Sequence, residues 1–218
     1  MDMQDIEGEA VCPLGDCQKR LQQSDLLRHL LSEHMLETPG VRFGLKLRRV
    51  RSGERTLLPL AYEQLGEGQD QCLCVLNWAC DDLMLTPQSN LPQTHRMLSH
   101  HLPILVMICK TTWRALFEKD DEKEDENEIG GNLYVIWMVA PATSRHILCQ
   151  LGFLNREFKC GLRVLRQVRN LATRLHINKY LLGVDHDYLT LSEQQLKQMC
   201  CRNECGCFLE VLVLGDIN

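Results

Sequence analysis

The fold class follows from three apolar stretches: PILVMICKT (residues 103–111), NLYVIWMVA (132–140) and HILCQLGFLN (146–155). Each stretch is short, rich in Leu, Val, Ile and aromatic side chains, and bounded by turn residues, which is typical of a β-strand. Their apolar runs are too continuous for a sheet that has one face in water. We therefore predict that two sheets pack face to face.

Further strands are expected on both sides of these three. In RFGLKLRRV (42–50), apolar and basic side chains alternate, which predicts a half-buried strand. One helix is expected in TLSEQQLKQMCC (190–201), with Thr190 or Ser192 as its N-cap. Strands without regularly alternating helices favour a mainly β, antiparallel sandwich over a parallel α/β sheet. The remaining strand candidates are RTLLPLAYE (55–63), QCLCVLNWA (71–79), CGLRVLRQV (160–168), KYLLGVDH (179–186) and FLEVLVLG (208–215).

Near the N-terminus, VCPLGDCQKRLQQSDLLRHLLSEH (11–34) has the ligand order of a zinc finger. Cys12, Cys17, His29 and His34 follow the spacing C-x4-C-x11-H-x4-H. Two thiolates and two imidazoles form a tetrahedral zinc site with no open position for water or substrate. The pattern therefore predicts one structural Zn²⁺.

The residues between these ligands support a turn followed by a helix. Pro13 and Gly15 allow a tight turn between the two cysteines, and Ser24 is expected to cap the helix. Because the histidines are five residues apart, the helix must loosen at its last turn to direct both rings at one ion. An apolar plug beneath the metal is expected from Leu21, Leu26 and Leu30.

The 218 residues have room for this finger and one larger domain. We expect a polar N-terminal tail over residues 1–10, a zinc-finger module over 11–36 and a β-sandwich over 40–216. The strongly acidic residues 118–131 cannot pack into a core and are expected to form a mobile loop within the sandwich.

Composition predicts a cytoplasmic or nuclear protein with no membrane partner. The net charge is −5, no apolar run is long enough to cross a bilayer, and MDMQDIEGEA (1–10) is acidic and polar. Without a secretory signal, reduced thiols and metal ligands explain the twelve cysteines better than disulfides do. Two interpretations stay open for Cys200, Cys201, Cys205 and Cys207, a second metal site and a cysteine-rich turn.

The order of these segments resembles the substrate-binding domain of seven-in-absentia-type proteins, which is a TRAF-like sandwich preceded by a zinc-finger module. The segments that carry the resemblance are PILVMICKT, the charged loop, NLYVIWMVAPATSRHILCQLGFLNREFKCGLRVLRQVRNL (132–171), KYLLGVDHDYLTLSEQQLKQMC (179–200) and FLEVLVL (208–214). It covers roughly residues 40–215 and implies an antiparallel TRAF-like β-sandwich that binds extended peptides.

The chain also departs from that family. It has no RING-type Cys/His array, so the family's ubiquitin-ligase activity has no residues to carry it, and a single two-Cys, two-His site replaces the paired fingers. The whole arrangement looks still more like insect proteins that share a domain of unknown function, which implies no activity.

Catalysis is not expected, because the sequence has no G-x-S-x-G, P-loop, G-x-G-x-x-G or H-E-x-x-H motif. Asp185, His186 and Asp187 are interpreted as a polar turn rather than as an acid–base cluster. We expect a non-enzymatic adaptor that binds protein or an extended peptide, with residues 163–168 and 150–155 as the first strands to consider.

The alternative is a nucleic-acid-binding protein that uses the finger and two basic stretches. Phosphate contacts from such stretches would make binding strongly salt-dependent. A single finger reads only about three base pairs, which makes this the less favoured interpretation. The basic side chains concerned are Arg42, Lys46, Arg48, Arg49, Arg51 and Arg55, and later Arg163, Arg166, Arg169 and Arg174.

Overall fold

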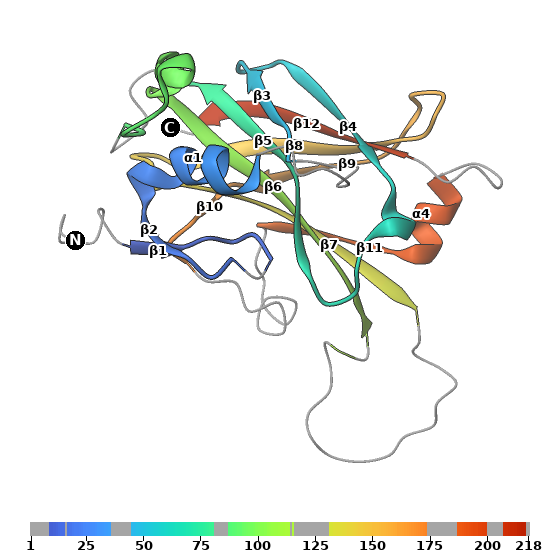
Figure 1. The fold of residues 1–218 in the computed structure, drawn as a ribbon. Coiled ribbons are helices and arrows are strands. Elements are labelled where there is room, and N and C mark those ends of the chain that lie inside the picture. Colours follow the sequence, from blue (N-terminus) through green and yellow to red (C-terminus); the bar gives the residue numbers. More distant parts are fainter. Residues whose placement is uncertain are drawn as a thin grey trace.

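The computed structural model describes residues 9–15, 17–35, 45–80, 87–113, 115, 131–173, 187–199 and 207–216. Within these residues the chain is mainly β, with two sheets packed face to face and a small N-terminal module on the outside of one of them (Figure 1). The predicted strand 179–186 and the predicted acidic loop, apart from its last residue, lie outside the described residues.

One sheet has six strands, in the order β10-β7-β6-β5-β3, with β11 also paired to β7. Most of its pairs are antiparallel, but β3 runs parallel to β5 and β10 runs parallel to β7. The predicted antiparallel sandwich is therefore modified by two short parallel pairs at the sheet edges. The strands are β3 (Leu47–Val50), β5 (Asp70–Ala79), β6 (His101–Thr112), β7 (Asn132–Ala140), β10 (Arg169–Asn170) and β11 (Tyr188–Ser192).

The second sheet has four antiparallel strands in the order β4-β12-β8-β9. Each of its strands sends alternate side chains into the space between the sheets. On β12, for example, Leu209, Val211 and Val213 are buried in the core. The strands are β4 (Arg55–Leu60), β8 (Ile147–Leu154), β9 (Cys160–Gln167) and β12 (Cys207–Asp216).

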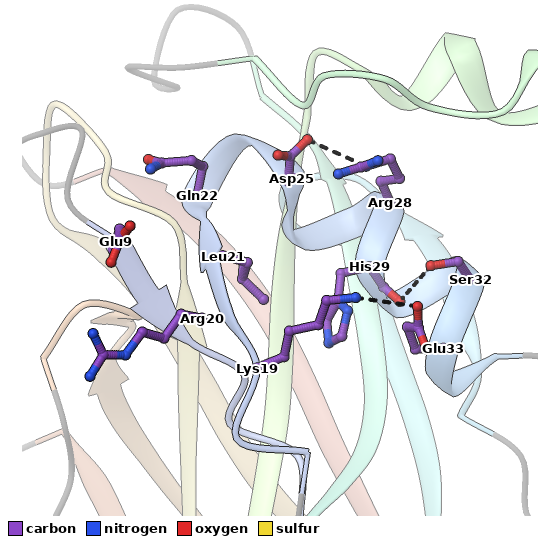
Figure 2. Close-up of a pocket in the computed structure, with 10 residues that line it drawn as sticks. All are labelled: Glu9, Lys19, Arg20, Leu21, Gln22, Asp25, Arg28, His29, Ser32 and Glu33. Carbon is purple, nitrogen blue, oxygen red and sulfur yellow. Dashed lines mark hydrogen bonds and ion pairs between the residues drawn. The ribbon is translucent and has the colours of Figure 1, made fainter.

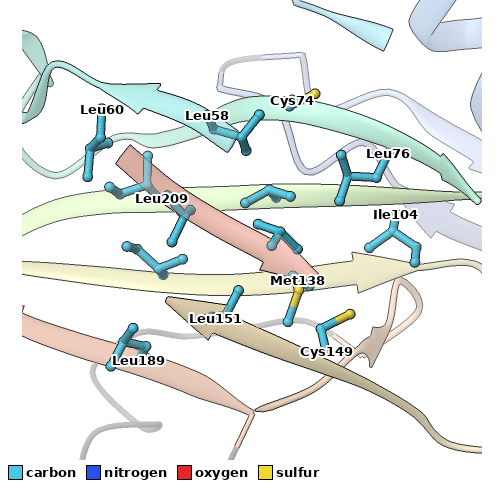
Figure 3. Packing of buried hydrophobic residues seen from close by; sticks show 14 of the residues in the cluster. Leu58, Leu60, Cys74, Leu76, Ile104, Met138, Cys149, Leu151, Leu189 and Leu209 are labelled. Carbon is cyan, nitrogen blue, oxygen red and sulfur yellow. The ribbon is translucent and has the colours of Figure 1, made fainter. Parts of the chain in front are cut away.

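Figure 3 shows this core, in which Leu58, Leu151 and Leu209 of the four-stranded sheet face Leu76 and Met138 of the six-stranded sheet. Each such side chain stabilises the fold by about 1.5–3 kcal/mol when it leaves water. The core is continuous from one sheet to the other, as the apolar stretches predict.

The central strand β6 shows why the apolar runs are so continuous. Its even positions, such as Ile104 and Val106, point into the core between the sheets. Its odd positions, such as Leu105 and Met107, point outward into a second buried cluster that includes residues of the N-terminal module. The run therefore reflects three layers, one more than the two packed sheets that its pattern predicts.

The N-terminal module adds a two-stranded hairpin to the predicted turn and helix. It consists of β1 (Glu9–Val11), β2 (Arg20–Gln22), a 3-10 turn η2 (Gln23–Asp25), the helix α1 (Leu26–His29) and a π-helical turn η3 (Leu30–His34). Figure 1 shows these blue elements beside β5 and β6, with which they share a buried cluster.

The C-terminal helix α4 (Glu193–Met199) starts three residues later than the expected segment does. Leu189 and Leu191 alternate into the core, so residues 188–192 form β11 instead. The N-cap of α4 is Ser192, which is one of the two candidates expected from the sequence. The backbone N–H of Gln195 donates to Ser192 Oγ (3.2 Å), and the Ser192 N–H donates to Gln195 Oε1 (2.8 Å), which is a capping box.

Two short 3-10 segments complete the described structure, η4 (Tyr62–Gln64) and η5 (Gln93–Leu98). Among the described helices, none is long and apolar enough to span a bilayer.

Candidate metal centre

The loop between β1 and β2 carries both cysteine ligands. The Cys12 N–H donates to the Lys19 carbonyl (2.8 Å), which closes the loop, and the Cys17 N–H donates to the Leu14 carbonyl (3.1 Å). Gly15 has a φ of +44°, a left-handed conformation that favours glycine. The predicted tight turn is therefore formed, and it directs two thiols toward the helix.

The two histidines come from α1 and from the π-helical turn that follows it. The Met35 N–H donates to the Leu30 carbonyl (2.9 Å), which is the i→i+5 bond of a π-turn. A π-turn places residues five apart on nearly the same side of the helix. The structure thus confirms that the H-x4-H spacing requires a loosened helix end.

The four side chains meet in one cluster. Cys12 Sγ lies 3.5 Å from His34 Nε2, Cys17 Sγ lies 3.4 Å from His29 Nε2, and the two Nε2 atoms are 3.2 Å apart. All four ligand atoms lie within 4.8 Å of one another. Bonds of about 2.3 Å to sulfur and 2.0 Å to nitrogen at the tetrahedral angle give S–N separations of about 3.5 Å and an N–N separation of about 3.3 Å. The residues therefore lie close enough to bind one metal ion.

Burial makes Cys12 a weaker acid and His29 and His34 weaker bases. Burial, with a further contribution from Cys17, raises the pKa of the Cys12 thiol to about 12. Burial also lowers the pKa of His29 and His34. Neutral imidazole is already the metal-binding form, and a divalent cation would drive the thiols to thiolates. The donor set of two sulfurs and two ring nitrogens is one that zinc prefers.

The apolar side of the module is buried against the six-stranded sheet. Leu21, Leu26 and Leu30 form the plug that the sequence predicts, and they share one cluster with Leu105 and Met107 of β6. Leu26 and Leu30 are fully buried. The helix that carries the histidines therefore packs on the sandwich and is part of its second buried layer.

Two buried glutamines, which sequence reasoning missed, join the module to the sandwich. Gln88 Oε1 accepts the Leu27 N–H (2.9 Å), and Gln88 Nε2 donates to the Gln23 carbonyl (3.0 Å). Gln23 Oε1 accepts the N–H of Ala142, in the turn between β7 and β8 (2.6 Å). Gln23 and Gln88 lie far apart in the sequence, and an isolated glutamine gives no signal that it will be buried.

The predicted N-cap at Ser24 is wrong. Ser24 lies inside η2, and α1 begins after Asp25 without a side-chain cap. The Ser24 carbonyl accepts the Ser89 N–H (2.8 Å), and Asp25 accepts the Ser89 hydroxyl (3.1 Å). Contacts with the segment before β6 thus replace the local cap, because the helix start lies against the sandwich rather than in water.

A shallow polar pocket of about 330 Å³ lies on the module's open side (Figure 2). Lys19 pairs with Glu33 (3.4 Å), and Arg28 pairs with Asp25 (3.4 Å). Part of the wall is formed by His29, whose buried Nδ1 has no hydrogen-bond partner in the described part of the chain. Positive and negative side chains alternate on this surface and largely neutralise one another.

The C-terminal cysteine cluster is only partly described by the structure. Cys207 is buried in β12, while Cys200, Cys201 and Cys205 lie outside the described residues, so the second metal site stays untested. The nine cysteines in the described part of the chain are free thiols.

Of the Asp185–Asp187 stretch only the last residue is described. Asp187 pairs with Arg169 (3.3 Å), a contact that joins β10 to the residue just before β11. Asp185 and His186 lie outside the described residues, so the interpretation of this stretch as a polar turn stays a prediction.

The arginine-rich strands make internal contacts. Arg48 donates to the Leu57 carbonyl (3.0 Å), and Arg166 donates to the Tyr188 carbonyl. Arg55 and Arg163 both contact the carboxylate of Glu210.

Fold and site together define the class: a mainly β sandwich protein with a two-Cys, two-His cluster, close enough to bind one metal ion, on the outside of one sheet. The chain belongs to the family described as "Domain of unknown function (DUF4729)", which matches residues 11–203. That match spans the metal centre and most of the sandwich. Neither the curated proteins nor the solved structures contain a match. The resemblance to seven-in-absentia-type and insect proteins gains no support from these comparisons beyond the shared description as a domain of unknown function.

Proposed function

We propose that this protein is a non-enzymatic, protein-binding adaptor whose N-terminal centre holds one structural Zn²⁺. The observation that carries the proposal is the position of the metal-binding helix. Leu26, Leu27 and Leu30 are fully buried, so the helix faces the sandwich. A finger that reads nucleic acid instead presents its helix to the major groove.

Zinc in this position acts as a cross-link between the β1–β2 loop and the helix. Four protein ligands fill the tetrahedron, which leaves no position for a substrate. Structural zinc contributes on the order of 10 kcal/mol to the folding of a small module. Here that free energy also fixes a layer of leucines over the outer face of β6.

The sandwich supplies the surfaces for a partner. β9 is an edge strand of the four-stranded sheet, and it contains residues 163–167 of the segment expected to bind. Exposed strand edges can accept an extended peptide through backbone hydrogen bonds, with side-chain pockets giving specificity. An extended protein segment is therefore the proposed class of ligand.

The nucleic-acid alternative has less support because several of the cations are already paired with acidic side chains of the chain itself. Lys19 and Arg28 are paired with acidic side chains on the module, and Arg169 is paired on the sandwich. Phosphate binding would have to break these pairs. The net charge of −5 also works against a polyanion.

Affinity purification of the tagged full chain from native cells, followed by mass spectrometry, tests the adaptor. We expect protein partners that stay bound after nuclease treatment and in raised salt. Recovery of nucleic acid, with binding that falls steeply as salt rises and is lost in Arg48→Ala/Arg49→Ala, would overturn the proposal.

A further inference from the structure

We propose that the outer face of the four-stranded sheet docks a protein segment that carries a carboxylate among apolar side chains. This inference rests on the proposed adaptor function and adds the surface and the chemistry of the partner. Three features of the face support it: exposed apolar side chains, a fixed pair of arginines and an aromatic residue held in an unfavourable backbone conformation.

Exposed apolar side chains distinguish this face. Among the described residues, four large hydrophobic side chains are exposed, and three of them belong here: Phe158 (57%), Leu165 (51%) and Leu214 (44%). Leu165 stands in a cross-strand row with Gln150 of β8 and Leu212 of β12. The outer face of the other sheet is instead covered by the leucines of the metal-binding module. Exposed apolar side chains along one face are typical of an interaction site.

The centre of the face holds two cations against one anion. The Glu210 side chain is 2% exposed and contacts Arg55 on one side and Arg163 Nη2 on the other (3.3 Å). Both arginine side chains are more than half exposed, at 58% and 51%. One positive charge therefore remains uncompensated, and both guanidinium groups are oriented before any partner arrives.

Gly152 lies between these groups and makes the arrangement possible. It faces Glu210 across one strand pair and Arg163 across the next. A β-carbon at this position would come within 2.9 Å of Glu210 Oε2 and 3.5 Å of Arg163 Cγ. The absence of a side chain thus allows Glu210 and its arginine partners to lie flat on the sheet.

This charge pattern selects the partner. A carboxylate that reaches the two guanidinium groups would form charge-assisted hydrogen bonds amid apolar contacts. A second copy docked face to face would instead bring like excess charges together. The geometry therefore points to a carboxylate-bearing apolar segment rather than to self-association.

Phe158 adds an independent indication. It lies in the β8–β9 hairpin with a φ of +58°, a conformation that a bulky residue rarely adopts. The Phe158 N–H bonds the Asn155 carbonyl (2.9 Å), and its ring stacks on Phe208 at 5.3 Å between centroids. Glycine would fit this backbone better, yet the chain places a half-exposed aromatic ring there. Strain of this kind is often found at binding sites.

The test uses the zinc-loaded full chain and a displayed library of random nine-residue peptides as the probe. We expect the selected peptides to combine Asp or Glu with apolar residues. Replacing the acid by its amide in a synthetic copy should weaken binding about tenfold. Amide shifts on binding should cluster on β8, β9 and β12.

Variants then locate the site. Arg163→Gln and Leu165→Ser should each weaken binding about tenfold, while Met97→Ser, an exposed apolar residue on η5, should not. Arg163→Glu should recover affinity for a peptide whose acid is replaced by Lys. Far-ultraviolet circular dichroism confirms that each variant is folded.

The two proposals fail differently. If peptides bind but Arg163→Gln and Leu165→Ser bind them as the unchanged chain does, the surface is wrong and the adaptor stands. If the best peptides lack a carboxylate, the inferred partner chemistry is wrong. If no peptide is enriched, the docking surface is overturned, whereas the adaptor function is decided by the affinity purification.

Discussion

The Nε2 atoms of His29 and His34 lie 3.2 Å apart, although the residues are five positions apart in the chain. An α-helix brings residues three or four apart onto one face, so this proximity depends on the π-turn that ends at His34. The π-turn therefore brings the two imidazole rings close enough to share one metal ion. It also leaves Leu30, at its start, pointing into the buried cluster beneath the centre.

Metal analysis should find one zinc per chain. His34→Ala should reduce the affinity of the chain for zinc by more than about a hundredfold, because even the loss of a residue that only supports a ligand lowers metal affinity about 10- to 100-fold. Zinc content and thermal unfolding with and without chelator provide the measurement. His100→Ala, an exposed histidine, is the control. Full hydrogen-exchange protection of residues 20–34 in zinc-free protein would contradict a structural role.

The grouping of Cys12, Cys17, His29 and His34 could be predicted from sequence because four residues of two types, in order and at close spacing, are typical of one metal site. The sandwich was also predictable, since apolar strand patterns record burial directly. What covers each face was not predictable. The run 102–109 of β6 is buried on both sides, and only the structure shows that the metal-binding module provides the second cover.

The boundaries of the secondary-structure elements and the long-range polar contacts could not be predicted from the sequence, for different reasons. Residues 188–192 end at a good helix cap, Ser192, and contain a short apolar alternation that suits either a strand or a helix. Tertiary pairing with β7 selects the strand. Gln23 and Gln88 meet only because the module docks where it does, so their partners depend on the fold itself.

Leu30→Ala should lower the free energy of unfolding by about 2–5 kcal/mol, because it opens a cavity in the cluster that joins the centre to the sheet. Denaturant unfolding measures this change. Leu214→Ala, at an exposed position, should change stability by less than about 0.5 kcal/mol. Equal effects of the two substitutions would show that the module does not depend on this packing.

Gln88→Ala should cost about 1–3 kcal/mol, because it leaves the Leu27 N–H and the Gln23 carbonyl buried without their partner. Hydrogen exchange should speed up at Leu27 more than in β6. Gln93→Ala, at an exposed position on η5, is the matched control. Unchanged exchange at Leu27 would mean that water or another group replaces the amide without loss.

Asp70→Asn should stabilise the protein at neutral pH. Burial raises the pKa of Asp70, although a hydrogen bond with Cys109 opposes the shift. The folded chain thus holds the Asp70 proton more tightly than the unfolded chain does. At a pH above the pKa of Asp70 in the folded chain, the ionised carboxylate therefore lowers the free energy of unfolding. The advantage of the variant should shrink as the pH falls through that pKa. Unfolding free energies measured across pH test this, with Glu63→Gln, at an exposed carboxylate, as control. A pH-independent difference would contradict the assignment.

Gly152→Ala should destabilise the four-stranded sheet although it adds one methyl group to a strand. The new β-carbon would lie 2.9 Å from Glu210 Oε2, and Glu210 is also held by Arg55 and Arg163. Moving this buried carboxylate disturbs both ion pairs, so we expect a loss of about 1–3 kcal/mol in denaturant unfolding. Gly131→Ala has nothing within 4 Å of its β-carbon and should be neutral or slightly stabilising. In a chain that already carries Glu210→Ala, adding Gly152→Ala should cost little stability. That result would assign the destabilisation to the contact between the new β-carbon and Glu210. If Gly152→Ala is as stable as Gly131→Ala, the carboxylate is free to move and the two arginines are not held in place.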